Sequence, residues 1–211
     1  MNHPAEKKLD DKGAKEKLLR AGISLFAEKG YASTSVREIV EKAGVSKPVL
    51  YYYFKSKEGL FLEILNTAAA RQEAMLARVL EMSGSVSDRL VQLSRETYQI
   101  VQENRDLFKM IHNLILGPPQ GAPDYDLDQF HRRMINVIEA IYLEGTTKND
   151  VKQADSKDVA FVVLGLIDFC FHLDHVRPEL LDPERPERLL RLAFHGFLTM
   201  EQPPGERGAE G

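Results

Sequence analysis

The sequence predicts an all-α protein of about nine helices, divided into an N-terminal three-helix head and a larger helical body. Apolar residues recur three and four positions apart along most of the chain, as in Leu60, Ile64 and Leu65, and this period is typical of amphipathic helices. No sustained alternation of apolar and polar residues indicates a strand. Glycine, proline and short polar residues interrupt the apolar pattern, for example at 117–123 and 178–186, where we expect loops.

The composition of the 211-residue chain is that of an ordinary globular protein, with 43% hydrophobic and 28% charged residues. Cys170 is the single cysteine, which excludes a disulfide within the chain. The first residues lack the apolar core of a signal peptide. The longest apolar run, 160–167, is far shorter than the roughly 20 residues that span a bilayer. These observations predict a cytoplasmic protein that does not enter a membrane.

The expected domain boundaries follow changes in composition and charge. We expect a head at 13–60, a body at 61–201 and flexible tails at 1–12 and 202–211. Residues 1–60 carry a net charge of +4, and the remainder carries a net charge of −8. A basic head suits an anionic partner such as nucleic acid, although a solvated lysine-rich tail explains the same asymmetry.

Two short helices separated by a tight turn are predicted within the head. Ser35 and Glu38 have the spacing of a capping box, which starts a helix. Gly44 occupies the position at which a helix ends in a left-handed residue, and Ser46 can cap the helix that follows. The result is a helix, a turn and a second helix in about 20 residues.

The second of these helices has an unusual outer side. Leu50 and Phe54 lie one turn apart and are expected to point inward. The opposite side then carries Pro48, Val49, Tyr51, Tyr52 and Lys55. Tyrosine hydroxyls and lysine ammonium groups suit phosphate oxygens, so this pattern fits a recognition helix in a DNA major groove. An ordinary helical hairpin, whose tyrosines pack on neighbouring helices, is the alternative.

The stretch 14–62 resembles the DNA-binding head of the TetR/AcrR family of transcriptional regulators. The segments LFAEKGY, TSVREI, AGVSK and LYYYFKSKE occur in the order and at the spacing of that family. The resemblance implies that Thr34 and Arg37 approach the DNA, that Lys47 and the two residues after it face the bases, and that Lys57 contacts a phosphate. Tyr53 stands where the family often has histidine. The expected DNA-binding residues, with the two caps, are Thr34, Ser35, Arg37, Ser46, Lys47, Pro48, Val49, Tyr51, Tyr52, Tyr53, Lys55 and Lys57.

A helix buried on two sides is predicted at 159–174, where the sequence is apolar nearly all round. One stripe of this helix runs through Phe161 and His172, and the opposite stripe runs through Val163 and Cys170. One stripe is expected to line a cavity and the other to meet a partner helix, and the sequence leaves open which stripe does which; the residues named below take the first stripe as the cavity wall. The resemblance implies a homodimer in which the last two long helices of each subunit form the interface. The expected interface residues are Val163, Leu166, Cys170, Leu190, Phe194 and Phe197.

The body is expected to hold a cavity for a small apolar effector, lined by adaptable methionine and aromatic side chains. Asp168 and His172 lie one turn apart in this apolar setting, as a satisfied internal pair, as residues that are not buried at all, or as a pair that orients a ligand. His172 and His175 have the spacing of metal ligands, but no further ligands complete a set, so no metal site is expected. The expected cavity residues are Phe108, His112, Phe130, Met134, Phe161, Asp168 and His172.

The sequence lacks the common signatures of catalysis, since it contains no Gly-rich phosphate loop, no G-x-S-x-G and no H-E-x-x-H motif. We therefore expect no catalytic residues and no cofactor. The predicted function is a ligand-responsive transcriptional regulator, most simply a repressor that a small apolar effector releases from a palindromic operator in double-stranded DNA. A helical protein-interaction module without sequence-specific DNA binding is the alternative.

Overall fold

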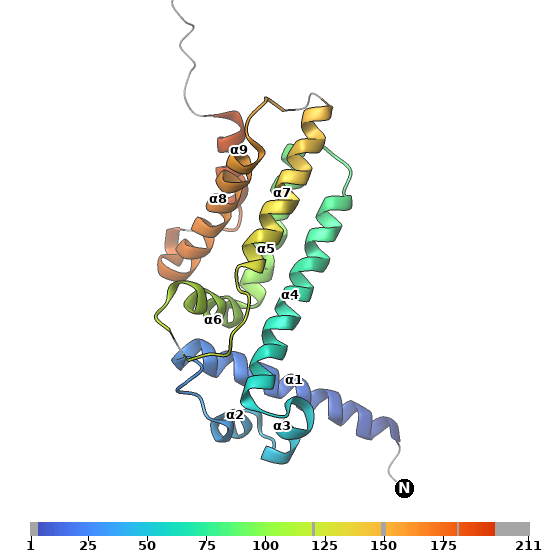
Figure 1. The fold of residues 1–211 in the computed structure, drawn as a ribbon, viewed down its shortest axis with the longest axis vertical. Coiled ribbons are helices and arrows are strands. Elements are labelled where there is room, and N and C mark those ends of the chain that lie inside the picture. Colours follow the sequence, from blue (N-terminus) through green and yellow to red (C-terminus); the bar gives the residue numbers. More distant parts are fainter. Residues whose placement is uncertain (1–3, 120, 149–150, 181, 197–211) are drawn as a thin grey trace, which may run out of the picture.

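The fold is all-α, as the sequence predicts, and its helices form a small head and an elongated body (Figure 1). The structure is a computed structural model that describes residues 4–119, 121–148, 151–180 and 182–196. Within these ranges it contains nine α-helices, one short 3₁₀ helix and no strand. The elements are α1 (Pro4–Lys29), α2 (Val36–Ala43), α3 (Lys47–Phe54), α4 (Lys57–Glu81), α5 (Val86–Glu103), α6 (Arg105–Leu116), α7 (Gln129–Thr147), α8 (Ser156–Val176), η1 (Pro178–Leu180) and α9 (Arg185–His195).

The head consists of α1, α2 and α3, and local signals set its helix ends. The Ser35 side chain accepts a hydrogen bond from the Glu38 N–H, and the Glu38 carboxylate accepts one from the Ser35 N–H at 2.8 Å, which completes the capping box. Gly44 ends α2 at φ 64° and ψ 35°, a left-handed conformation that glycine adopts without a steric penalty. Ser46 precedes α3, but its side chain makes no capping hydrogen bond, contrary to the prediction.

Helix α4 joins the head to the body. It begins beside α3 and runs from the head along the body beside α7 (Figure 1). The Ser56 side chain caps it by accepting a hydrogen bond of 2.9 Å from the Gly59 N–H. Leu60 and Phe61, near its start, belong to the head core, whereas Met75 and Val79, near its end, belong to the body core. One rigid element therefore crosses both cores.

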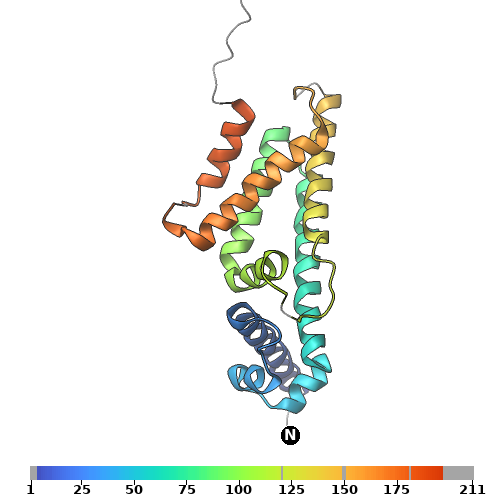
Figure 2. The same cartoon turned by 60° about the vertical axis from the view of Figure 1, so that its left-hand side comes forward.

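Helix α6 also connects the two parts. It lies across the top of α1, beneath the remaining helices of the body (Figures 1 and 2). Its buried residues Leu107, Met110 and Ile111 pack into the head core together with residues of α1 and α4. The loop that follows α6 contacts the head as well, since Ala122 and Tyr125 pack against the same core.

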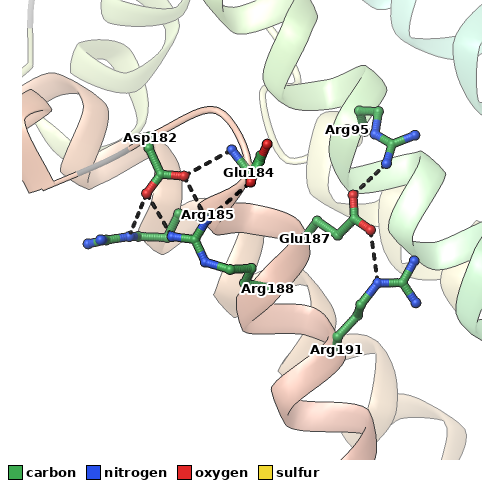
Figure 3. A network of polar contacts seen from close by, with 7 residues as sticks. All are labelled: Arg95, Asp182, Glu184, Arg185, Glu187, Arg188 and Arg191. Atoms are coloured by element: carbon green, nitrogen blue, oxygen red, sulfur yellow. Dashed lines mark hydrogen bonds and ion pairs between the residues drawn. The ribbon is translucent and has the colours of Figure 1, made fainter.

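Helices α8 and α9 occupy the outer side of the body, where α8 slants across α7 and α5 (Figure 2). A polar network fixes the start of α9 (Figure 3). Arg188 donates two hydrogen bonds to the Asp182 carboxylate, at 2.8 and 2.7 Å, and these bonds lower the pKa of Asp182 to about 2. Glu187 accepts hydrogen bonds from Arg191 and from Arg95 of α5. The last helix is thereby attached to the body by charge-assisted contacts.

The N-terminal tail predicted at 1–12 is helical in the structure from Pro4 onward. Residues 4–12 form the first turns of α1 rather than a loose tail. The helix begins at Pro4, where the missing N–H group costs nothing because the first-turn N–H groups of a helix have no intrahelical partner. Residues 1–3 and the predicted tail 202–211 lie outside the described residues.

Candidate DNA interface and ligand cavity

Helix α3 presents an exposed face that combines cations, hydroxyls and aromatic rings. Leu50 and Phe54 are 0% and 5% exposed, so they fasten the helix to the head core as predicted. On the opposite side Tyr51 and Tyr52 are 46% and 67% exposed. The other exposed side chains on or beside this helix are Ser46, Lys47, Pro48 and Lys55. Large exposed rings next to lysines are well suited to a phosphate backbone and a groove edge.

Two of the predicted DNA-binding residues of α3 are less accessible. Val49 is half-buried and packs against the head core. Tyr53 is also half-buried, and its ring stacks edge-on against Tyr52 at a centroid distance of 5.0 Å. We interpret Tyr53 as a support that fixes the direction of the exposed Tyr52 ring, because such aromatic pairs have a preferred geometry.

The predicted DNA-binding residues before and within α2 also include both exposed and buried side chains. Arg37 is exposed and donates a hydrogen bond of 2.6 Å to Glu41 one turn later. Ser35 is exposed, but its side chain and its N–H serve the capping box. Thr34 is 1% exposed, and its hydroxyl donates a hydrogen bond of 2.8 Å to the Gly30 carbonyl. The expectation of a Thr34 side-chain contact to DNA is therefore wrong in this structure, because the hydroxyl is used inside the head.

Lys57 is also engaged within the head. Its ammonium group donates hydrogen bonds of 2.9 Å to the backbone carbonyls of Tyr31 and of Thr34. It also lies 4.0 Å from the centroid of the Tyr31 ring. Burial lowers the pKa of Lys57. The sequence offers no signal for the two distant carbonyls that hold this side chain, and its contact with a phosphate stays a prediction.

The body contains a cavity of about 630 Å³ between α4, α5, α6, α7 and α8. Its volume lies within the range of about 300 to 1,000 Å³ that is common for small-molecule sites. Six of the seven predicted cavity residues line it: Phe108, His112, Phe130, Met134, Asp168 and His172. Phe161 does not line it and is 57% exposed on the outer side of α8, so that prediction is wrong.

The polar partner of Asp168 is a residue that the sequence did not single out. His131 of α7 places its Nε2 atom 3.5 Å from Oδ2 of Asp168, and both side chains line the cavity. Burial raises the pKa of Asp168, and the nearby His131 opposes this shift. The predicted pairing of Asp168 with His172 is replaced by a contact across two helices, which only the packing of α7 on α8 reveals.

Two residues of α6 belong to the cavity and to the head at once. Leu107 and Ile111 line the cavity, and both are also part of the head core. A change in the shape of the cavity therefore acts directly on side chains that support α1. This shared position could not be predicted from the sequence, because the apolar spacing of α6 does not show which core each face meets.

The α8 residues predicted to form the dimer interface are buried or half-buried within one subunit. Val163, Cys170 and Leu190 are 0%, 2% and 0% exposed, so they pack inside one subunit and cannot meet another. Leu166 and Phe194 are half-buried against the same body core, and Phe197 lies outside the described residues. The reason is that α7, α5 and α9 of the same subunit cover the aliphatic stripe. The large apolar residues exposed on α8 and α9 are Phe161, Val162, Phe169, Val176 and Leu192.

Other groups that could carry chemistry are not arranged for it. Cys170 is buried, and burial raises the pKa of its thiol to about 11, which suppresses the reactive thiolate. Within the described parts of the chain, no three His, Cys, Asp or Glu side chains gather as a metal site would require. None of the helices described there is long and apolar enough to cross a membrane.

Comparison with known proteins places the head in a defined family. Residues 18–64 match the family described as "Bacterial regulatory proteins, tetR family". The transcriptional regulator QacR of Staphylococcus aureus is 52% identical over 169 residues, which cover 74% of this chain and 85% of that protein. The chain spans 60%, 17% and 18% of the lengths of three other matching regulators, all from Bacillus subtilis.

Solved structures share the whole fold. The TetR family transcriptional regulator PfmR of Thermus thermophilus gives a TM-score of 0.71 at 23% identity, over 86% of this chain and 96% of that one. FadR of Bacillus subtilis, solved in complex with stearoyl-CoA, gives a TM-score of 0.67 at 20% identity, over 87% and 99% of the two chains. At these identities the two structures support the fold, and the match to QacR supports the family. The chain belongs to the TetR family of bacterial regulatory proteins.

Proposed function

We propose that this protein is a ligand-responsive transcriptional regulator that binds a palindromic operator in double-stranded DNA as a homodimer in the cytoplasm. The observation that carries the proposal is the exposed face of α3, the second helix of a helix-turn-helix, with Lys47, Tyr51 and Tyr52 directed away from the head. As part of this proposal we keep the domain division predicted from the sequence, a DNA-binding head at 13–60 and a ligand-binding and dimerisation body at 61–201.

The exposed apolar residues of α8 and α9 support the homodimer. Phe161, Val162 and Leu192 are 57%, 55% and 47% exposed, on two adjacent helices. Large apolar side chains exposed on neighbouring helices suit an interaction surface. A two-fold axis through this surface would bring the same residues of two copies together and place two heads on two half-sites of one operator.

The cavity supports the response to a small effector. Most of its wall is apolar, including Met75, Met134 and Leu164. The fold neighbour FadR was solved with stearoyl-CoA, a molecule with a long apolar part, which is compatible with a mainly apolar effector here. The body of this chain differs enough in sequence that the effector is not transferred from that protein.

Coupling would run through α6 and α4. Leu107 and Ile111 touch both the cavity and the head, and α4 extends from the head core to the cavity wall. An effector that fits the cavity best when α6 is displaced would favour a position of the heads that does not match two adjacent major grooves. Release from the operator, and hence repression in the absence of effector, is the simplest form of this mechanism.

The alternatives of an enzyme and of an interaction module without DNA binding have less support. The relatives QacR and PfmR are transcriptional regulators by name. The exposed lysines and tyrosines of α3 are better suited to an anionic groove than to an apolar protein partner, because an apolar partner would leave Lys47 and Lys55 unpaired.

Selection of bound duplexes from a random DNA pool tests the proposed function. We expect enrichment of two-fold symmetric sequences whose half-sites lie about one helical turn apart or a multiple of it. The double variant Lys47→Ala with Tyr52→Ala should lose the enrichment while keeping its helical circular dichroism. Lys152→Ala, at an exposed lysine before α8, is the matched control and should select the same sequences as the wild type. Failure of the wild type to enrich any duplex would refute the DNA-binding function.

A further inference from the structure

The cavity wall combines buried apolar side chains with polar side chains that are more exposed. Met75, Met134 and Leu164 are 2%, 3% and 8% exposed. The side chains of His131 and Asp168 also line the cavity, but they remain 41% and 44% exposed. A molecule with one apolar tail and one polar head group matches this division.

The Asp168 carboxylate is able to accept further hydrogen bonds. Its ion-pair contact in the structure is the one from Nε2 of His131 at 3.5 Å, which is longer than the 2.7–3.2 Å usual for an N–H···O hydrogen bond. An ionised carboxylate has about four lone-pair positions on its two oxygens. Burial raises the pKa of Asp168, which reflects incomplete solvation of its charged form. A ligand that donates a hydrogen bond would replace the missing solvation.

Two other polar groups of the wall, Asp174 and Thr97, already have hydrogen-bond partners within the protein. The Oδ1 atom of Asp174 accepts hydrogen bonds from Gln102 at 2.7 Å and from Arg105 at 3.2 Å. The Thr97 side chain is buried, and its hydroxyl donates to the Leu93 carbonyl within its own helix. Neither group therefore depends on a ligand for a partner.

The Gln72 side chain, which also lines the cavity, has a partner for its amide nitrogen but not for its amide oxygen. Its Nε2 donates a hydrogen bond of 3.1 Å to the Phe130 carbonyl, which fixes the orientation of the amide. Its Oε1 is buried and has no donor among the described residues. Because Oε1 has almost no exposed surface, a ligand reaches it only after the side chain turns. Gln72 Oε1 and the Asp168 carboxylate are thus two acceptors of the wall without a close donor among the described residues, and of these two the Asp168 carboxylate is the accessible one.

We propose that the effector carries a hydrogen-bond-donating head group, a hydroxyl or an amine, which donates to the Asp168 carboxylate while its apolar tail lies among Met75, Met134 and Leu164. This proposal deepens the proposed function and rests on it, because it names the ligand class of the same cavity. A carboxylate head group would be repelled by Asp168 instead. A carboxylate head group would bind well only if it paired with the exposed cations Arg71 and Lys109, which also line the cavity.

Four probes of matched length test the proposal by isothermal titration calorimetry on the full chain without DNA. They are 1-decanol, decylamine, 1-methoxynonane and decanoate. The ether has as many heavy atoms as the alcohol but no donor. We expect the alcohol and the amine to bind about tenfold or more tighter than the ether, because hydrogen bonds to charged groups are among the stronger ones. We expect decanoate to bind more weakly than the alcohol.

Variants at Asp168 identify the acceptor. Asp168→Leu should bind the ether and the alcohol equally well, because the acceptor is gone and the apolar volume is kept. Asp168→Asn keeps an acceptor oxygen but removes the charge, so it should weaken decylamine more than decanol and thereby separate the two kinds of head group. Asp158→Leu, at an exposed aspartate of the same helix that does not line the cavity, is the matched control and should keep the wild-type preference.

The outcomes separate this proposal from the proposed function. Equal binding of all four probes, tightest binding of decanoate, or a donor preference that survives in Asp168→Leu would each overturn the proposal and leave the cavity as an effector site. No binding of any probe would overturn both the proposal and the response to an apolar effector. Selection of operator DNA is measured separately and does not depend on any of these results.

Discussion

The ammonium group of Lys57, the first residue of α4, donates a hydrogen bond to the backbone carbonyl of Tyr31 at 2.9 Å. A second hydrogen bond of the same length goes to the Thr34 carbonyl. The residue thus attaches the start of the long helix to the turn between α1 and α2. The recognition helix α3 lies between these two attachment points in the chain, so Lys57 stabilises the frame that holds it.

Replacing Lys57 by methionine is expected to lower the free energy of unfolding by about 1–3 kcal/mol, because two partly buried carbonyls lose their donor. The slope of log affinity for DNA against log salt concentration should stay unchanged, since no phosphate contact is lost. In Lys47→Ala the slope should fall by about one unit. Urea unfolding and DNA titrations at several salt concentrations measure both quantities. A stable Lys57→Met protein with a reduced slope would instead show that Lys57 contacts a phosphate.

A second prediction concerns the outer face of α8. Phe161→Asp should convert the proposed dimer into a monomer of 23.9 kDa, because the charge would be buried against the same face of the second copy. Its helical content should not change, since the side chain is 57% exposed within one subunit. Sedimentation equilibrium measures the mass, and affinity for a full operator should fall as the two half-sites bind independently.

Leu143→Asp is the matched control for this experiment. Leu143 is a similarly exposed apolar residue, 51% exposed, but it lies on α7 rather than on α8 or α9. The control should remain a dimer. A dimeric Phe161→Asp protein, or dissociation caused equally by both substitutions, would place the interface elsewhere.

The head could be predicted almost completely from local sequence signals. A capping box, a left-handed glycine and a pair of apolar residues one turn apart are short-range features, and Ser35, Gly44, Leu50 and Phe54 adopt the expected positions. The continuous helix α4 was also predictable, because its apolar period is unbroken from 57 onward.

The errors arise where the outcome depends on distant packing. The helix at 159–174 is apolar nearly all round, so its sequence does not show which stripe its own subunit covers. Phe161, predicted to line the cavity, is exposed, and Val163, predicted to form the interface, is buried in the body core. The contact of His131 with Asp168 joins residues far apart in the chain. The partners of Lys57 are backbone carbonyls, which no residue type identifies.

Helices α5 and α7 meet at Gly145, and this contact gives a third prediction. A Cβ atom at Gly145 would lie 2.2 Å from Cγ2 of Val86, closer than two non-bonded carbon atoms can approach. Gly145→Ala is therefore expected to destabilise the protein by about 1–3 kcal/mol through overpacking. This sign is opposite to the usual gain of up to about 1 kcal/mol when alanine replaces glycine inside a helix.

The double variant of Gly145→Ala with Val86→Ala should recover part of the lost stability, because the clashing methyl group is removed. Gly13→Ala in α1 is the control, since a Cβ atom there meets nothing within 4 Å. Chemical unfolding of the four proteins gives the coupling energy. Additive effects of the two substitutions would show that the helices separate instead of clashing.

The last prediction concerns the dependence of stability on pH. Hydrogen bonds from Lys29 and then from the backbone and side chain of Ser35 lower the pKa of Glu38 from 4.5 to about 2. Because the pKa is lower in the folded state, the ionised carboxylate stabilises the head fully above pH 4.5, and this contribution is lost as the pH falls toward 2.

Glu38→Gln keeps the shape of the capping box but not the charge. The difference in free energy of unfolding between wild type and Glu38→Gln should thus be largest near neutral pH and should shrink steadily below pH 4.5. Glu16→Gln, in an exposed pair 3.6 Å from Arg20, should give a much smaller difference under the same conditions. A wild-type advantage over Glu38→Gln that stays constant down to pH 2.5 would show that the Lys29 and Ser35 contacts do not depend on the charge of Glu38.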